Sequence, residues 1–425
     1  MTQSLFERFA LNAEILRAVA EEGYQTPTPI QLAAIPELLA GHDLLATAQT
    51  GTGKTAAFAL PMLHLLDARP AQGARPIRAL ILTPTRELAL QIEGSLRAYG
   101  RHLSVGTAVI LGGVPASPQI RALQRRPEIL IATPGRLLDL MGQGFVRLDR
   151  IEMLVLDEAD RMLDMGFLPD VRKIVAKCPA ARQTMFFSAT LSGEIADLAS
   201  DMLRNPVKVA VTPSASISVN IEQRVFFVEQ ENKRNLLSGM LKKMNIQRAL
   251  VFTRTKHRAN RIMEQLSKDG ISAEAIHSNK SQNARQRALE AFDRGRVRVL
   301  VATDIVARGI DVEGISHVIN FELPSEAESY VHRIGRTARA GAAGIAMSFC
   351  CAEEVPMLKD IEKLTKVALT ADEDHHFHSA STAALYKSHV ASSFALPRFN
   401  DRRGKPSAPP RRSGRTNRGR NQRAY

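Results

Sequence analysis

The sequence has few cysteines and no long apolar run. Its three cysteines, Cys178, Cys350 and Cys351, are too few and too badly spaced for a disulfide framework or a zinc site. No stretch reaches the roughly 20 consecutive apolar residues that a membrane-spanning helix needs. The opening residues 1–8 also lack the charged lead and apolar core of a secretory signal. We therefore expect no membrane partner, and a reducing cytoplasm is the expected compartment.

Acidic residues are almost missing from the end of the chain. Residues 398–425 contain ten Lys or Arg and one Asp, so this segment holds +9 of the net charge of +14. The basic residues lie among Gly, Pro, Ser and Asn, with little apolar surface to bury. We therefore predict that residues 371–425 form a disordered, low-complexity basic tail that contacts polyanions. The three histidines within 375–378 could bind a metal, but we interpret this segment as an exposed polar hinge.

A glycine-rich turn stands between an apolar run at 44–46 and a predicted helix that begins near Ala56. A strand, such a turn and a helix are together typical of a loop that binds phosphate through successive backbone N–H groups. Lys54 would reach the β- and γ-phosphates of a nucleotide, and the Thr55 hydroxyl would bind Mg²⁺. The alternative is an ordinary surface turn, and Ala48 departs from the glycine that opens the general pattern. We interpret the turn as a nucleotide site made of Ala48, Gln49, Thr50, Gly51, Thr52, Gly53, Lys54 and Thr55.

An acidic element follows the apolar run at 151–156, which is expected to be a buried parallel strand. Ligands of open α/β sheets collect at the carboxyl ends of strands, where Asp157 and Glu158 would lie. Asp157 would bind Mg²⁺ directly or through water, and Glu158 would activate the attacking water. Either carboxylate alone could instead cap a helix. Together with a phosphate-binding loop, the pair favours nucleotide hydrolysis.

The tetrad at 157–160 spells D-E-A-D, and the chain resembles the DEAD-box ATP-dependent RNA helicases. Matching segments extend from Phe6 to Cys351. Two of them, 255–261 and 276–285, are most similar to the bacterial RhlE-type branch of the family. The resemblance implies ATP and Mg²⁺ as cofactors, RNA as the partner, and two RecA-like domains in tandem.

The resemblance also assigns residues outside the glycine-rich turn to ATP. Gln31 matches the Q-motif glutamine that reads the adenine edge, and an amide can donate and accept there at once. Phe6 matches an upstream aromatic residue that stacks on the base, and Tyr24 belongs to the same motif. Gly309 and Asp311 would face the ribose.

Two arginines near the end of the matching region, Arg336 and Arg339, are similar to the arginine fingers that stabilise charge on the γ-phosphate. Their spacing of three places them on one face if the segment is helical. Ala338 stands where the family usually has glycine, and Ser278 is a milder departure of the same kind. Because both arginines are present, we expect activity, and Ala338 bears on the geometry of domain closure.

Apolar and helical segments alternate along the chain, which predicts α/β domains with parallel sheets covered on both faces. Several expected strands end in turns that resemble the family's RNA motifs, and their side chains suit phosphate and sugar. Helix capping is the alternative for each turn taken singly. The predicted RNA-contacting residues are Pro84, Thr85, Arg86, Gly113, Thr133, Pro134, Gly135, Arg136, Thr253, Arg254, Thr303 and Asp304. The residues predicted to couple the nucleotide and RNA sites are Asp160, Ser188, Thr190 and His332.

Small polar residues around Pro213 indicate a linker between two domains. We predict a first RecA-like domain at 1–211, the linker at 212–220, and a second RecA-like domain at 221–370. ATP and RNA would both bind across the cleft, so each would promote binding of the other. The predicted function is an RNA-dependent ATPase and ATP-dependent RNA helicase that locally separates short duplexes.

Other functions stay open. One is an ATP-regulated RNA clamp or annealing chaperone with little true unwinding, which Ala338 and the basic tail keep under consideration. A DNA translocase has less support, because the motif set matches the RNA branch. The tail could also contact ribosomal proteins or proteins of RNA decay.

Overall fold

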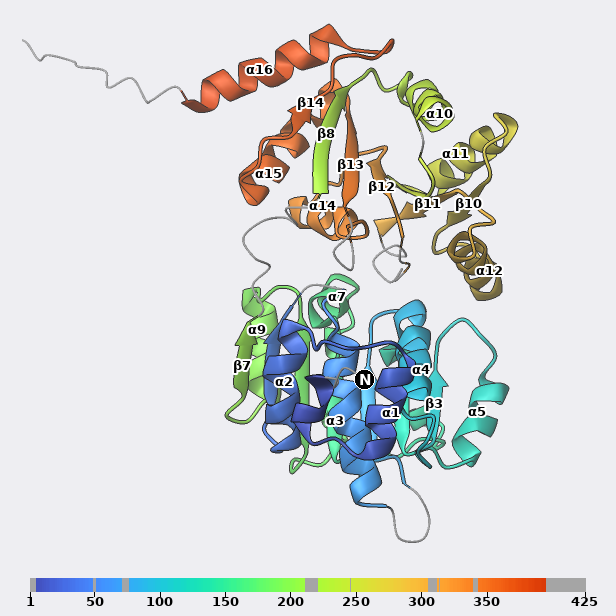
Figure 1. Cartoon of the computed structure of the whole chain (residues 1–425), viewed down its shortest axis with the longest axis vertical. Helices are drawn as coiled ribbons and strands as arrows, with labels where there is room; N and C mark the ends of the chain where they lie inside the picture. The colour runs from blue at the N-terminus through green and yellow to red at the C-terminus, as the bar shows by residue number, and fades with distance from the viewer. Residues whose placement is uncertain are drawn as a thin grey trace, which may run out of the picture.

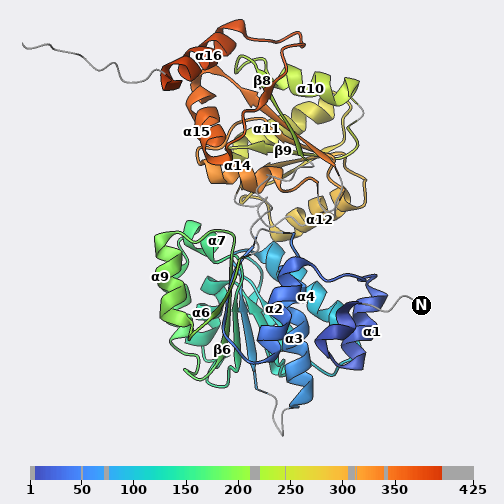
Figure 2. The same cartoon turned by 60° about the vertical axis from the view of Figure 1, so that its left-hand side comes forward.

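The computed structural model has two α/β lobes that follow one another along the chain (Figure 1). It describes residues 5–48, 51–70, 76–210, 221–244, 246–304, 312, 314–338 and 343–394, with side chains up to Ser388. Figure 2 shows that α7 (Ala159–Asp164) of the first lobe and α12 (Gln282–Asp293) of the second lie beside the junction between the lobes. Among the described residues, none of the helices combines the length and apolar character needed to cross a membrane.

The first lobe contains a seven-stranded sheet in the order β3-β4-β2-β5-β6-β1-β7, and its paired strands are parallel. Central strands such as β5 are short apolar runs with every residue buried, as a parallel sheet covered on both faces requires. The register places Leu82 opposite Leu156, so β2 and β5 end together. The strands are β1 Leu44–Thr47, β2 Ala79–Leu82, β3 Thr107–Ile110, β4 Ile129–Ala132, β5 Met153–Leu156, β6 Gln183–Ser188 and β7 Val207–Ala210.

Helices cover both faces of this sheet, because successive strand residues point to opposite sides. Ile81 and Val155 pack under α1 to α4, whereas Leu80 and Leu154 pack under α6 to α9. The helical elements of this lobe, besides α7, are η1 Leu5–Phe9, α1 Ala13–Glu21, α2 Pro29–Leu39, α3 Lys54–Ala68, α4 Arg86–Tyr99, α5 Ala116–Gln124, α6 Pro134–Gly142, α8 Leu168–Val175 and α9 Gly193–Met202.

The second lobe repeats the architecture with the strand order β10-β11-β9-β12-β13-β8-β14. Val251 and Val301 pack under α10 and α11, and Leu250 and Leu300 pack on the opposite face with Phe292 of α12. Its strands are β8 Ile221–Phe227, β9 Ala249–Thr253, β10 Ala273–Ile276, β11 Val299–Thr303, β12 His317–Asn320, β13 Gly344–Cys350 and β14 Thr370–Ala371. Its helical elements, besides α12, are α10 Lys233–Lys243, α11 Lys256–Lys268, α14 Ala327–Ile334, η3 Ala352–Glu354, α15 Val355–Thr365 and α16 Ala380–Phe394.

The predicted start of the tail at residue 371 is wrong, because the second lobe continues through α16. The ring of Tyr386 lies 5.1 Å from that of Phe227, and its hydroxyl donates to Glu362 at 2.7 Å. The histidines within 375–378 are only partly exposed, since His376 is exposed but His375 is half-buried with its ring 5.6 Å from that of Phe226. The described residues contain no cluster of three or more His, Cys, Asp or Glu side chains suited to a metal. Residues 395–425 lie outside the described part of the chain.

Candidate functional site

The glycine-rich turn connects β1 to α3 at the carboxyl edge of the first sheet, as the sequence predicted. Gly51 and Gly53 have positive φ angles of 84° and 90°, which glycine adopts without strain. A Cβ atom on Gly53 would lie 2.5 Å from Gln31 Nε2, so a larger residue would displace that side chain. The buried Lys54 donates from Nζ to the Ala48 carbonyl at 3.0 Å. The turn therefore holds its lysine inside the loop that would receive a phosphate.

Gln31 joins the start of α2 to the glycine-rich turn. Its Oε1 accepts a hydrogen bond from the Thr28 backbone N–H at 2.9 Å, which forms a capping box with Thr28. Its Nε2 donates to the Gly53 carbonyl at 3.1 Å, and the side chain is buried. The amide thus already uses one donor and one acceptor, and it retains a second of each for a base edge.

Asp157 and Glu158 follow β5, next to the turn. Asp157 is 2% exposed, and burial raises the pKa of its carboxyl to about 6, although the charge of Lys54 opposes the shift. Burial also acts to raise the pKa of Glu158, but the charges of Arg161, Lys54 and Arg336 outweigh it and lower that pKa. Glu158 Oε2 accepts from Arg161 Nη1 at 3.0 Å. The pKa values of the two adjacent carboxyls are therefore shifted in opposite directions.

The backbone of Glu158 is strained, with φ 53° and ψ 54° in the left-handed region. A residue with a Cβ adopts this conformation at a cost of roughly 1–2 kcal/mol. Such strain concentrates at functional sites, where the surroundings enforce it. Here it lies at the point where the chain turns from β5 into α7.

Asp160 connects α7 to the end of β6. Its Oδ2 accepts from the backbone N–H groups of Ala189 and Thr190, each at 3.1 Å. The Ser188 hydroxyl donates to the Thr190 carbonyl at 2.7 Å and accepts from the Asp160 N–H at 3.3 Å. A cavity of about 400 Å³ is lined by Asp160 and Thr190 of the first lobe and by His332 of the second. The structure therefore brings together the four residues predicted to couple the two sites.

Arg336 reaches the first lobe from the end of α14. It is 3% exposed and lines a cavity of about 20 Å³ together with Glu158, Asp160, Arg161 and His332. A guanidinium from one lobe thus lies beside the DEAD carboxylates of the other. This is the arrangement expected of a residue that stabilises charge at a nucleotide between the lobes.

A groove of about 270 Å³ contains most of the first-lobe residues predicted to contact RNA. Gly113 has φ 69°, and a Cβ there would overlap the Arg86 guanidinium, so the pair requires glycine. Thr85 caps α4 by accepting from the Leu88 N–H at 3.4 Å, so the capping alternative holds at this turn as well. The groove is lined by Pro84, Thr85, Arg86, Glu87, Gly112, Thr133, Gly135, Arg136, Met165, Phe167, Ser278 and Arg285.

Comparisons with known proteins show the family of the chain. A family model for DEAD/DEAH box helicases matches residues 28–198, and a helicase conserved C-terminal domain model matches residues 232–341. The DEAD-box ATP-dependent RNA helicase CshA of Bacillus cereus is 42% identical over 361 residues, which cover 85% of this chain and 68% of the relative. The CshA helicase of Listeria monocytogenes is 42% identical over 363 residues, covering 85% and 69%. The chain belongs to the DEAD-box ATP-dependent RNA helicases.

Solved structures resemble most of this DEAD-box helicase. Dbp5 of S. cerevisiae, bound to RNA and ADP BeF3, is 30% identical and has a TM-score of 0.79, covering 87% of this chain and 96% of that one. Mss116p bound to ssRNA and AMP-PNP is 28% identical with a TM-score of 0.77, covering 86% and 78%. The two lobes of the helicase are accordingly tandem RecA-like domains, and the protein is an ATP-hydrolysing enzyme of an RNA helicase family.

The helicase also has contacts between its lobes that the sequence analysis missed. Arg285 Nη2 lies 2.6 Å from Glu87 Oε1, and both side chains are buried. Gln282 Nε2 donates to the same oxygen at 3.1 Å, and Arg86 Nη1 donates to Gln282 Oε1 at 3.4 Å. From the sequence, Glu87 would be interpreted as an ordinary acidic residue in the first turn of α4. Its partners Gln282 and Arg285 lie in the segment 276–285, which resembles the family but contains no predicted site residue.

Arg333 is a second residue that sequence reasoning missed. It is 1% exposed and binds Asp304, predicted to contact RNA, through two bonds of 2.6 and 2.7 Å. It also donates to the Glu322 carbonyl at 2.7 Å. Thr303, at the end of β11, is buried beside this contact. The carboxylate of Asp304 is therefore already engaged by a cation of the helicase itself.

Phe6 and Tyr24 belong to the predicted adenine site, but each packs against another aromatic residue of the protein. Phe6 is 1% exposed and packs edge-on against Phe9 with ring centroids 5.9 Å apart, so it is a core residue here. Tyr24 is 40% exposed, and its ring lies 6.1 Å from that of Tyr99. Stacking of Phe6 on a base stays a prediction. Five further predicted residues lie outside the described part of the chain: Gln49, Thr50, Gly309, Asp311 and Arg339.

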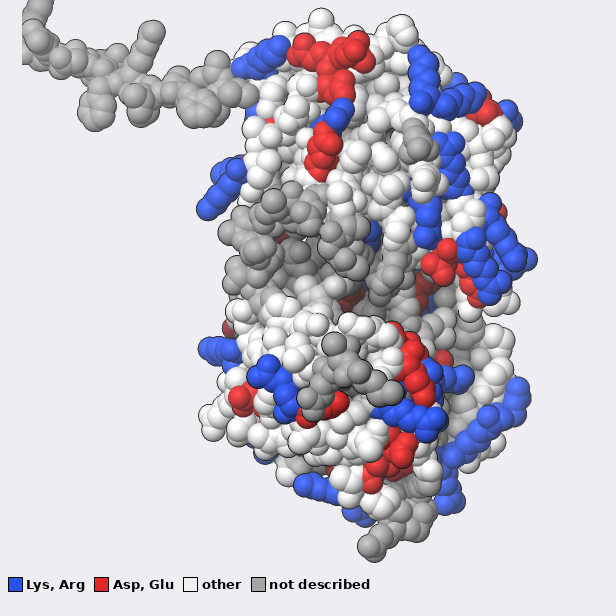
Figure 3. Space-filling model, viewed as in Figure 1, with Lys and Arg blue, Asp and Glu red and all other residues white. Residues whose placement is uncertain are grey.

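Basic side chains gather on the face of the second lobe that carries α10, α11 and α12 (Figure 3). Exposed basic residues of these helices include Lys243 of α10, Arg261 of α11 and Arg287 of α12. The groove of the first lobe meets this lobe at Ser278 and Arg285. A polyanion in the groove would therefore continue toward a positively charged surface.

Proposed function

We propose that the helicase binds ATP and RNA across the two lobes, hydrolyses ATP in the cleft and uses the cycle to separate short RNA duplexes. The observation that carries the proposal is the small cavity shared by Glu158 and Arg336, because neither lobe alone supplies both groups. Dbp5, whose fold matches over most of the chain, was solved with RNA and ADP BeF3. Its likeness supports joint binding of nucleotide and RNA here.

In the proposed chemistry, Lys54 exchanges its bond with the Ala48 carbonyl for the β- and γ-phosphates of ATP. Glu158, whose pKa is lowered by neighbouring cations, is ionised at neutral pH and accepts a proton from the attacking water. Arg336 stabilises the charge that develops on the γ-phosphate. Gln31 would read adenine with the donor and acceptor that Thr28 and Gly53 leave unused.

The residues present fit a magnesium ion that accompanies ATP. Asp157 is a buried carboxylate whose pKa is raised by burial, so a nearby divalent cation would favour its ionised form. Thr55 is the second residue of α3, beside the phosphate-binding turn. Asp157 and Thr55 would hold the ion, which neutralises phosphate charge when bound.

For RNA, we propose contacts through backbone and sugar along the groove of the first lobe. Its threonines, glycines and arginines suit phosphates and 2′-hydroxyls better than base edges. Little sequence preference and a preference for RNA over DNA would follow. We also propose a first domain at 1–211, a linker at 212–220 and a second domain that extends beyond 370 to include α16.

The test compares two rates in the same protein. RNA-stimulated ATP turnover and unwinding of a short duplex should both fall when Glu158 is changed to Gln, whereas binding of ATP and RNA should persist. An ATP-regulated clamp would instead show RNA-stimulated turnover with strand separation no faster than spontaneous melting. Turnover near the wild-type rate in Glu158→Gln would refute the proposed catalytic site.

Three finer assignments also stay proposals. The RhlE-type branch rests on the segments 255–261 and 276–285, whereas the relatives found are named CshA. A cytoplasmic location rests on the scarcity of cysteine. Contacts between the tail and ribosomal or RNA-decay proteins rest on its charge alone.

A further inference from the structure

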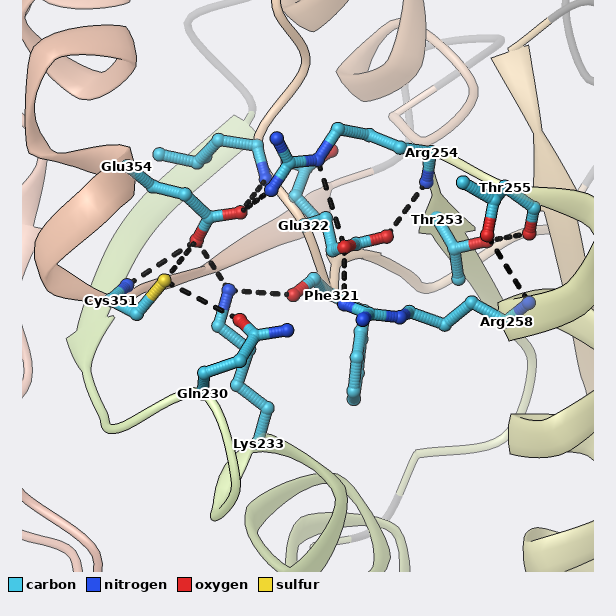
Figure 4. A network of polar contacts seen from close by, with 12 residues as sticks. Gln230, Lys233, Thr253, Arg254, Thr255, Arg258, Phe321, Glu322, Cys351 and Glu354 are labelled. Atoms are coloured by element: carbon cyan, nitrogen blue, oxygen red, sulfur yellow. Dashed lines mark hydrogen bonds and ion pairs between the residues drawn. The ribbon is translucent and has the colours of Figure 1, made fainter.

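The turn after β9 is held by charged side chains at the carboxyl edge of the second sheet (Figure 4). Thr253 and Arg254 were predicted from the sequence to contact RNA. In the structure, Thr253 is fully buried, and its hydroxyl donates to the Thr255 carbonyl at 3.1 Å. The guanidinium of Arg254 lies between two carboxylates, with Nη2 2.8 Å from Glu354 Oε1 and Nε 3.6 Å from Glu322 Oε1.

Glu354 anchors Arg254 to the interior of the lobe. Its side chain is 1% exposed and forms an ion pair with Lys233, which is fully buried. Its oxygens also accept from the backbone N–H groups of Leu323 and Cys351, each at 3.3 Å. A buried carboxylate with so many donors is costly to disturb, because any loss leaves a charge without compensation. Glu354 is therefore a fixed point for Arg254.

Glu322 anchors the backbone of the same turn. Its Oε2 accepts from the Arg254 N–H at 2.9 Å, and its Oε1 binds the guanidinium of Arg258. Arg258 belongs to the first turn of α11, which Thr255 caps by accepting from the Arg258 N–H at 3.3 Å. Glu322 is 5% exposed on its side chain. The two carboxylates thus fix the turn at its guanidinium, its backbone and the start of the following helix.

We propose that Arg254 is a positioning residue that fixes the RNA-facing turn at 253–255, and that it does not itself bind a phosphate. A phosphate could reach the guanidinium only in competition with two carboxylates that are already desolvated. The side chain of Arg254 is 35% exposed, but its guanidinium is held by Glu354. Thr255, the other exposed residue of the turn, would therefore contact RNA in the shape that this network sets. The inference rests on the RNA binding proposed above and deepens it.

The change Glu322→Gln distinguishes the two roles by the sign of its effect. If Arg254 binds phosphate, weakening its carboxylate partner frees a cation and removes a negative charge, so RNA should bind more tightly. If Arg254 positions the turn, the same change loosens the turn and RNA should bind less tightly, by roughly ten-fold or more for the loss of one charged hydrogen bond. Tighter binding in Glu322→Gln, measured by anisotropy of a labelled single strand with an ATP analogue present, would overturn the proposal.

The salt dependence of binding gives a second and independent measurement. Removing a direct phosphate ligand lowers the slope of log affinity against log salt by about 0.7 on a single strand. Arg254→Ala should weaken binding at every salt concentration and leave the slope unchanged. Arg136→Ala is the matched control, because Arg136 lines the proposed RNA groove of the first lobe and should lower the slope.

The control also separates this inference from the proposed function. If Arg136→Ala leaves RNA affinity and slope unchanged, the proposed groove is wrong. If both arginine variants lower the slope, the groove stands and the positioning role of Arg254 falls. Arg254→Lys covers the case in which Glu322→Gln does not fold. A lysine can replace a phosphate ligand but cannot span two carboxylates, so weaker RNA binding with normal RNA-free ATP binding supports the proposal, and wild-type RNA affinity refutes it.

Discussion

The guanidinium of Arg336, from the second lobe, lies in one small cavity with the carboxylate of Glu158, from the first, and its charge lowers the pKa of that carboxyl. This arrangement has two functional consequences. Arg336 adds to the charges of Arg161 and Lys54 that favour the ionised form of the proposed base, and it also stands where charge would develop on a nucleotide. Separation of the lobes would remove both effects at once, so hydrolysis should require their association.

Arg336→Ala should reduce RNA-stimulated ATP turnover by roughly a thousand-fold or more, the usual effect of losing an arginine finger. Removal of its charge should also raise the pKa of Glu158. The acid limb of the pH–rate profile depends on the ionised base, so it should move to higher pH. Steady-state turnover measured over a pH series tests both effects. ATP affinity of the first lobe serves as the control and should stay unchanged, and a profile that does not move would exclude the electrostatic coupling.

Asp157→Asn should stabilise the nucleotide-free protein in a pH-dependent way. The pKa of Asp157 rises from 3.8 to about 6 on folding, so its ionised form destabilises the fold above that range. The shift of about two units corresponds to about 3 kcal/mol. Asn avoids this cost, so the gain in unfolding free energy should be largest at about pH 8 and should vanish near about pH 3, below both pKa values. Denaturant unfolding of the two proteins at several pH values checks the prediction.

A gain that is equal at about pH 3 and about pH 8 would show that Asp157 is not the titrating group. Glu158 titrates in both proteins, so the comparison isolates Asp157. The variant should also lose ATP turnover, since the substitution removes a proposed ligand of Mg²⁺.

Glu87 and Arg285 should contribute to the association of the lobes and not to the stability of either lobe. Their ion pair is buried, and breaking such a pair by removing one partner costs roughly 3–5 kcal/mol. Arg285→Gln should therefore raise the RNA concentration needed for half-maximal ATP turnover, with little change in thermal unfolding. Arg97→Gln is the matched control, because Arg97 pairs with Glu93 on the surface of α4 and such pairs contribute little. Equal effects of the two variants would contradict a role at the lobe junction.

Ala338→Gly should stabilise the second lobe and preserve activity. Ala338 has φ 54°, a left-handed conformation that costs a residue with a Cβ roughly 1–2 kcal/mol. Glycine relieves this strain but gains freedom in the unfolded chain, so a net stabilisation of about 0.5–1 kcal/mol is expected. Ala196→Gly, at an exposed position inside α9, is the control and should destabilise by about 1 kcal/mol. Loss of stability in Ala338→Gly would show that its methyl group matters more than the strain.

The parts of the fold that the sequence predicted are those encoded in short segments. Ten residues or fewer are enough to recognise each of three features in the sequence. These are the strand at 153–156, the acidic pair that follows this strand, and the turn at 51–55. Apolar runs specify a buried parallel strand, and closely spaced glycines allow the positive φ angles of a tight turn. Position at the carboxyl edge of one sheet then follows from the parallel order alone.

The contacts that the sequence did not predict join residues far apart along the chain. Gln282 and Glu87 are separated by 195 residues, and Arg254 and Glu354 by 100. From the neighbouring sequence alone, each of these side chains would be interpreted as a helix cap or a solvated charge. Their roles depend on how the lobes and strand ends meet in space, which local spacing does not encode. α16 was missed because its few apolar side chains, such as Tyr386, give little periodic signal.

The basic tail after α16 should add electrostatic affinity for RNA without taking part in hydrolysis. It holds ten Lys and Arg within residues 398–425. Each phosphate neutralised on a single strand adds about 0.7 to the slope of log affinity against log salt. If about three tail cations bind at once, truncation after Leu396 should lower that slope by about 2. The truncation leaves α16, which ends at Phe394, intact.

RNA affinity of the truncated protein should fall most at low salt and little at high salt, where screening already weakens the tail. Turnover at saturating RNA should hardly change, because the proposed catalytic residues lie in the two lobes. Titration of labelled RNA at several salt concentrations, for the full-length and truncated proteins, decides between this tethering role and an inert tail. An inert tail predicts equal slopes. Loss of turnover at saturation would instead mean that residues after Leu396 support the folded lobes.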